Sequence, residues 1–225
     1  MLSSIDYESL CDFQGLPIVR ETLTNQSNGF VITGMPPVTD EAFVDLEREI
    51  GRSKLLKKDL PGLAESSSSS ISSLFEVLHK TSQQVFKNLS HALELPWERY
   101  LGEMHEFTAD GQDEIRIIKP NHSLPNAWST LTLVIDQSSP SQAVVLYGAA
   151  LAVFSEGNTA ISNNPIIVNS LLLKTYTCDS GDRLVYYVRP NDGVFYTRTA
   201  GALMTPLSGE EHASRKRVRE ITSVA

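Results

Sequence analysis

The chain has 225 residues, of which 41% are hydrophobic and 20% are charged, and its formal net charge at pH 7 is −8. These values are typical of one globular domain, and the acidic balance argues against nucleic-acid binding, which needs clustered lysine and arginine. The only cysteines, Cys11 and Cys178, exclude a disulfide framework and a cysteine-based zinc site. Because neither a secretory signal nor a membrane-spanning run is visible, we expect a cytoplasmic protein that does not bind membranes.

Residues 1–60 are expected to form a small α/β segment. The run from Leu16 to Leu23 has helical spacing, and the apolar run Gly29–Gly34 is bounded by glycines, which is typical of a strand. Thr39 can cap the helix that follows. The buried face of that helix is indicated by residues at positions i, i+3 and i+7, namely Phe43, Leu46 and Ile50.

A serine-rich stretch separates this segment from a long helix. Residues 62–72 cannot bury apolar surface, so we expect a flexible loop there. Ser73 and Glu76 have the spacing of a capping box, which predicts a helix over residues 73–95 that ends before Pro96. His79 and His91 on this helix are expected to face solvent.

From about residue 114 onward the periodicity changes from helical to strand-like. Apolar or alternating runs separated by turn signals predict short strands, and the run from Ala143 to Phe154 is expected to supply one or two of them. Turn residues Asn163–Pro165 and an alternating tail, Val218–Val224, fit the same pattern. Helices confined to the first half and strands to the second predict a mainly β, α+β fold built on a jelly roll or double-sheet barrel.

His105 and Glu106 form an adjacent pair that is capable of acid–base chemistry. Neighbouring residues on a strand point to opposite faces, so we expect this pair to lie at the surface rather than to act together. The sequence contains no nucleophile elbow, no phosphate-binding loop and no dinucleotide-binding glycine motif.

Several short stretches resemble one enzyme family. They are Leu131-Thr132-Leu133-Val134, Asn191-Asp192-Gly193, Leu93-Glu94-Leu95-Pro96, Gly181-Asp182 and the strand Glu114–Pro120. Each is similar to a segment of the 2-oxoglutarate/Fe(II) oxygenases of the isopenicillin N synthase type. The resemblance implies a single domain over residues 1–225, with a double-stranded β-helix (jelly-roll) core formed by residues 114–225 and braced by helix 73–95.

The ligand positions of that family are replaced in this chain. The resemblance places Pro125 and Ala127 where the family has the His and Asp of its His-x-Asp motif, and Gly201-Ala202 near its second His. None of the five histidines is followed two positions later by Asp or Glu, although His122 could be displaced into the site. The family's Arg-x-Ser pair for 2-oxoglutarate is also missing from the arginines of the tail. We therefore predict neither a metal nor a cofactor.

A barrel without iron would leave a concave site for a small apolar organic molecule. The residues that we expect to act on such a substrate are Arg116, Tyr187 and Arg198, and those expected to bind it are Trp128, Thr132, Val134 and Tyr147. Strand alternation means that about half of such residues point inward. The alternative is that the aromatic residues fill the core and that the arginines form salt bridges.

Three functional hypotheses follow from this interpretation. The first is a metal-independent cyclase or isomerase, such as a pericyclase of the Diels–Alder type, that acts on an apolar natural-product intermediate by orienting and polarising it. The second is a non-catalytic binding or partner protein with a pseudo-oxygenase fold. The third is an active oxygenase with unusual ligands. The sequence leaves the oligomeric state open.

Overall fold

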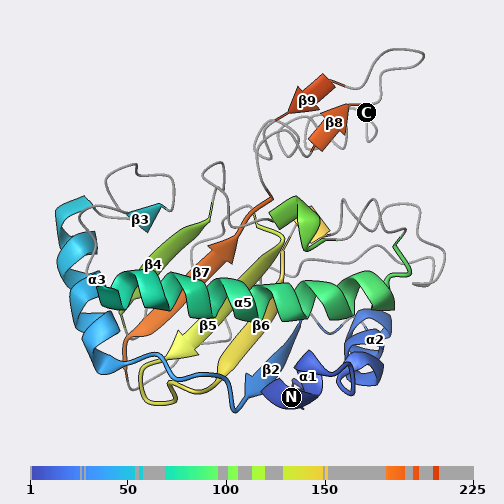
Figure 1. The fold of residues 1–225 in the computed structure, drawn as a ribbon, viewed down its shortest axis with the longest axis horizontal. Helices are drawn as coiled ribbons and strands as arrows, with labels where there is room; N and C mark the ends of the chain where they lie inside the picture. Colours follow the sequence, from blue (N-terminus) through green and yellow to red (C-terminus); the bar gives the residue numbers. More distant parts are fainter. Residues whose placement is uncertain are drawn as a thin grey trace, which may run out of the picture.

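The computed structural model describes residues 2–25, 27, 29–53, 56–57, 69–95, 101–105, 113–119, 129–148, 150–151, 181–190, 195–197 and 205–207. These residues form a mixed α+β structure, in which helices lie across one face of a seven-stranded sheet (Figure 1). This agrees with the α+β class predicted from the sequence. None of the helices in the described ranges is long and apolar enough to cross a membrane.

The large sheet combines strands from distant parts of the chain. Its order is β1-β2-β6-β5-β7-β4-β3. The strands are β1 (Ser4–Asp6), β2 (Gly29–Thr33), β3 (Leu56–Lys57), β4 (Glu114–Ile118), β5 (Leu131–Asp136), β6 (Ala143–Tyr147) and β7 (Arg183–Val188). Only β1 and β2 pair in parallel; the other neighbours are antiparallel. Strands β8 (Phe195–Thr197) and β9 (Thr205–Leu207) form a separate antiparallel pair.

The N-terminal segment contains the predicted helices and strand. Helix α1 (Tyr7–Cys11) begins where Asp6 accepts a hydrogen bond from the backbone N–H of Glu8, and α2 (Leu16–Thr24) and β2 follow as expected. Thr39 caps α3 (Asp40–Ser53), because its hydroxyl accepts a hydrogen bond of 3.2 Å from the N–H of Ala42. The predicted buried face of α3 is confirmed at Phe43 and Leu46.

Helix α5 (Ser69–Ala92) begins one turn earlier than predicted. Ser73 therefore lies inside the helix rather than at its start, and the predicted capping box is wrong. Residues 69–72 of the expected loop are helical as well, because the buried stripe of α5 already begins at Ile71. The Ser70 hydroxyl also donates a 2.5 Å hydrogen bond to Asp45 on α3, which joins the two helices. Helix α5 ends at Ala92, three residues before the predicted end at residue 95 and still ahead of Pro96.

The predicted strand run from Ala143 is also shorter than expected. Strand β6 ends at Tyr147, and residues 150–151 are helical. At Gly148 the chain passes so close to its neighbour that an added Cβ would lie 2.1 Å from the carbonyl oxygen of Ser129. The rest of the run, the turn at residues 163–165 and the tail at residues 218–224 lie outside the described residues.

Both faces of the sheet are buried. On the first face, side chains such as Phe30, Leu133 and Tyr186 join the main hydrophobic core with residues of α2, α3 and α5. Figure 1 shows α5 running across this face. On the opposite face, which we call the second face, a smaller cluster consists of Ile118, Val134, Leu146, Val185 and Tyr187. No helix in the described ranges covers the second face.

Candidate functional site

The strand register places the residues of the second face in rows across β4, β7, β5 and β6. The first row consists of Glu114, Tyr187, Thr132 and Leu146, and the next of Arg116, Val185, Val134 and Val144. Successive residues of a strand alternate between the two faces, so members of these rows project to the same side. The first row is largely polar, whereas three of the four residues in the next row are valine.

Four of the predicted site residues lie together on this face: Arg116, Thr132, Val134 and Tyr187. Tyr147, by contrast, lies on the opposite face. Its hydroxyl is 2.6 Å from the hydroxyl of Thr22 on α2, and burial raises its pKa above the ordinary tyrosine value. The neighbouring Leu146 occupies the second face instead, because adjacent strand residues point in opposite directions. Tyr147 is therefore a member of the helix-packed core.

The remaining predicted positions lie outside the described residues. These are Trp128 and Arg198, the displaced candidate His122, and the replaced ligand positions Pro125, Ala127, Gly201 and Ala202. Their roles stay predictions.

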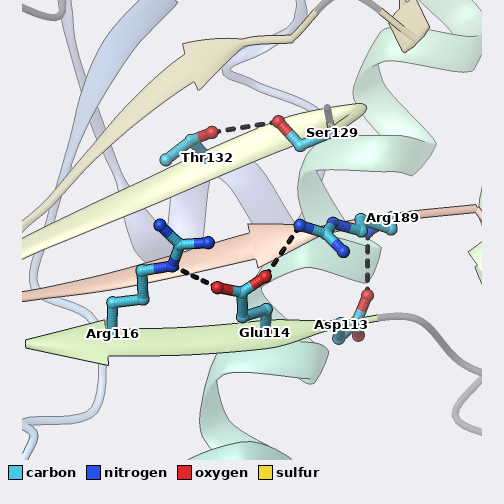
Figure 2. A network of polar contacts seen from close by, with 6 residues as sticks. All are labelled: Asp113, Glu114, Arg116, Ser129, Thr132 and Arg189. Atoms are coloured by element: carbon cyan, nitrogen blue, oxygen red, sulfur yellow. Dashed lines mark hydrogen bonds and ion pairs between the residues drawn. The ribbon is translucent and has the colours of Figure 1, made fainter. Parts of the chain in front are cut away.

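A buried ionic network connects β4 with the end of β7 (Figure 2). Glu114 accepts a hydrogen bond from Nε of Arg116 on one side and forms a 2.7 Å ion pair with Nη2 of Arg189 on the other. Asp113 accepts hydrogen bonds from the backbone N–H of Arg189, at 2.9 Å, and from the hydroxyl of Tyr186. Opposite charges compensate one another here, as buried ions require.

Sequence reasoning missed the acidic members of this network. The available signal was the alternation of Glu114 and Arg116 within an otherwise apolar strand. Two residues apart on a strand, these side chains share a face, so their opposite charges could have been recognised as a pair. Arg189 lies just after β7 and Asp113 just before β4, so strand alternation does not connect either of them to the network.

Tyr187 lies beneath the guanidinium group of Arg116. The Arg116 Cζ atom is 5.3 Å from the centroid of the Tyr187 ring, within the range of a cation–π contact. Burial raises the pKa of Tyr187 to about 12, partly offset by the positive charge of Arg116. Tyr187 therefore keeps its proton at neutral pH, so its hydroxyl can donate a hydrogen bond but does not act as a base.

At the edge of the same face, Ser129 and Thr132 form a second polar contact. Their hydroxyl groups are 3.1 Å apart, and both side chains are buried (Figure 2). Thr132 pairs in register with Tyr187 on the neighbouring strand. Polar groups from β4, β5 and β7 therefore converge at one end of the second face.

His105 is buried, whereas the sequence predicted that it lies at the surface. It lies in a short 3₁₀ helix, η2 (Glu103–His105), is 2% exposed and stacks on Phe86. Its Nδ1–H donates to the carbonyl oxygen of Leu101, and its Nε2 accepts from the hydroxyl of Thr130, both at 2.6 Å. Burial lowers the pKa of His105 to about 3. Glu106 lies outside the described residues.

The described ranges contain no group of three His, Cys, Asp or Glu residues that could hold a metal ion. The two ring nitrogens of His105 are already engaged by protein atoms, the Glu114 carboxylate is paired with Arg116 and Arg189, and Asp113 accepts hydrogen bonds from Arg189 and Tyr186. These residues therefore do not fit an iron site. The segments from which the resemblance would take the ligands, residues 125–127 and 201–202, are not among those described.

A hollow of about 250 Å³ lies on the helical side of the molecule, between the start of α3 and the start of α5. Among the described residues that line it, Glu41 is the only charged one, and its walls include Val38, Leu74 and Val77. It contains none of the converging polar groups described above, so we place the candidate site on the second face of the sheet.

Comparison with known proteins identifies similar folds. No family model matches the sequence, and no curated protein sequence matches it significantly. Among solved structures, a putative oxygenase from Shewanella oneidensis has a TM-score of 0.50 at 11% identity, over 98% of this chain and 99% of that one. The Arabidopsis thaliana dioxygenase for auxin oxidation, AtDAO1, has a TM-score of 0.51 at 11% identity, over 90% of this chain and 97% of that one. At such low identity, the likeness establishes an oxygenase-like fold and nothing about activity.

Proposed function

We propose that the second face of the sheet is the inner wall of a double-stranded β-helix barrel and that this wall binds a small organic molecule. Two observations support the barrel. Side chains of the second face such as Val185 and Tyr187 are buried, although no described helix covers them. The chain also aligns over 90% or more of its length with the solved structures of a putative oxygenase and a dioxygenase. A second layer of strands would bury this face and enclose a site between the layers.

The proposed reaction is a metal-independent cyclisation or isomerisation of a mostly apolar substrate. The observation that carries it is the juxtaposition of a valine row with polar groups of Arg116, Tyr187 and Thr132 on one face. The valines would hold a flexible apolar chain in a folded conformation, and such orientation can supply up to about 7–11 kcal/mol of the barrier. Arg116 and Tyr187 would donate hydrogen bonds to a polarised carbonyl group. The sequence supports independence from iron, because no histidine starts a His-x-Asp or His-x-Glu motif.

A non-catalytic binding protein is the second candidate. The engagement of both Arg116 and Arg189 by the single carboxylate of Glu114 favours it, because such a network can serve to hold strands together without touching a substrate. The two candidates differ in whether a bound molecule is converted.

Thermal unfolding of chelator-treated protein tests the proposal. A ligand that binds only the folded state raises the unfolding midpoint once its concentration exceeds its Kd. We expect no shift from Fe(II) or Mn(II) with 2-oxoglutarate, and a saturable shift from at least one flexible polyene that carries a conjugated carbonyl group. That polyene should then be converted, in the presence of chelator, to a product of unchanged mass.

Each other outcome identifies an alternative. Binding without conversion would favour the non-catalytic protein. A saturable shift with metal and 2-oxoglutarate, together with Fe(II)-dependent decarboxylation of 2-oxoglutarate, would replace the proposal by an active oxygenase with unusual ligands.

A further inference from the structure

Arg116 presents one edge of its guanidinium group on the second face. Its Nε donates to Glu114, and its Cζ lies over the Tyr187 ring. Within the part of the chain that the structure describes, its two terminal nitrogens have no hydrogen-bond partner. In Figure 2 the Arg116 side chain extends from β4 toward β5, the strand that carries Thr132, and these nitrogens lie at its far end.

The orientation of this edge is set by its surroundings. Glu114 is buried and is itself held by Arg189 through the 2.7 Å ion pair, so it does not rotate freely. The Tyr187 ring supports the guanidinium plane from below. The Arg116 side chain is 29% exposed, whereas that of Arg189 is 10% exposed. Of the two arginines of the network, Arg116 is therefore the one that a ligand can reach.

The residues beside Arg116 define what such a ligand must contain. The row that starts at Arg116 continues through Val185, Val134 and Val144 on successive strands. Neighbouring strands are about 4.8 Å apart, so the three valines form an apolar strip about 10 Å long. The planar fork of arginine matches a carboxylate through two parallel hydrogen bonds. A charged end and an apolar strip therefore adjoin.

We propose that the substrate is an amphipathic carboxylate, whose carboxylate binds the terminal nitrogens of Arg116 and whose apolar body lies along the valine row. This inference rests on the proposed function, because it assigns the polar end of the molecule bound to the second face. It adds a chemical class that the fold does not specify.

The test compares matched acids and amides. The probes are octanoate and 2-naphthylacetate, each beside its primary amide, and their affinities are measured by calorimetry for the full-length chain. In the unaltered protein, whichever of the two acids has the higher affinity should bind at least about tenfold more tightly than its own amide, because only the acid forms charge-assisted hydrogen bonds with arginine. In Arg116→Gln, this preference should fall to about one, while the affinity for the amide stays within about threefold.

Two further variants separate recognition from folding and from general charge. Arg116→Lys keeps the charge but loses the fork, so it should retain only part of the preference for the acid. Lys119→Gln removes a positive charge three residues further along the chain, where Lys119 is exposed and pairs with Glu47 and Asp182. It should leave the preference unchanged. Circular dichroism and melting curves establish that every variant is folded before its binding is compared.

The outcomes distinguish this inference from the proposed function. Equal binding of acid and amide by the unaltered protein, or a preference for the acid that survives Arg116→Gln, would overturn the carboxylate assignment and leave the small-molecule site standing. Binding of neither acid nor amide would overturn the proposed function and this inference with it.

Discussion

The surroundings of His105 determine its protonation state. The carbonyl of Leu101 can only accept a hydrogen bond, so Nδ1 holds the proton and Nε2 accepts from Thr130. A second proton would have to displace the Thr130 hydroxyl in a site closed to water. The histidine therefore stays neutral in the folded chain far below the pH at which an exposed imidazole is protonated.

The stability of the protein should fall in mild acid because of this residue. The pKa of His105 is about 3 when folded and about 6.5 when unfolded, so between these values only the unfolded chain binds the proton. Lowering the pH from 6.5 to 5 should remove ~2 kcal/mol of unfolding free energy through this group. Urea unfolding at the two pH values should show that the unaltered protein loses more unfolding free energy than His105→Gln does. The control His91→Gln, which removes an exposed imidazole, should lose as much as the unaltered protein. Equal losses in His105→Gln and the unaltered protein would contradict the assignment.

Tyr147 and Tyr187 lie on opposite faces of the sheet and should respond differently to loss of their hydroxyl groups. Tyr147→Phe removes the hydrogen bond to Thr22, which should lower the unfolding free energy by about 1 kcal/mol without changing probe affinity. Tyr187→Phe removes a hydroxyl from the second face and should weaken probe binding. Denaturant unfolding and calorimetry on both variants measure the two effects. A loss of probe affinity in Tyr147→Phe would return that tyrosine to the candidate site.

The different fates of these predicted residues have a physical origin. Arg116, Thr132 and Tyr187 could be recognised as polar or aromatic residues on strands, but a sequence does not state which face of a strand is the helix-packed one. The register that aligns Thr132 with Leu146 and Leu131 with Tyr147 decides this, and it depends on pairing between distant strands. The ionic partners Glu114 and Arg189 are joined by the same long-range pairing.

At the scale of elements, periodicity predicted most strands and helices but not their ends. Strands β4, β5 and β7 lie where alternating or apolar runs were found, and α3 starts at its predicted cap. The start of α5 was misplaced because local capping chemistry favoured Ser73, while burial of Ile71 against the core extended the helix by one turn. Tertiary packing overrode the local signal.

The two serines at the start of α5 provide a direct test of that correction. Ser70→Ala removes the hydrogen bond to Asp45 and should lower the unfolding free energy by about 1 kcal/mol. Ser73 is exposed inside the helix, so Ser73→Ala should be neutral or slightly stabilising, because alanine has the higher helix propensity. Chemical denaturation of both variants compares them. If Ser73→Ala proved the more destabilising of the two, the helix would begin where the capping box placed it.

For the whole molecule, the class of fold could be predicted but the order of strands could not. Helices gathered in the first half and short strands in the second indicated a mixed, mainly β architecture, and the observed sheet and helices are mixed α+β. Nothing in the local pattern indicates that β2 pairs with β6, more than a hundred residues later, or that β4 and β5 are separated by β7. Such pairings are selected by the packing of complete faces.

The central position of β7 in the sheet means that the sheet stays incomplete until late in the synthesis of the chain. Strand β7 inserts between β4 and β5, so each of those strands lacks one of its two neighbours until residue 188 has left the ribosome. Until then the nascent chain presents two open edges, one of them the apolar run of β5, and such edges readily pair with other chains. Chains that stop short of Arg183 should therefore depend on chaperones or be degraded, although most of their sheet residues are already present.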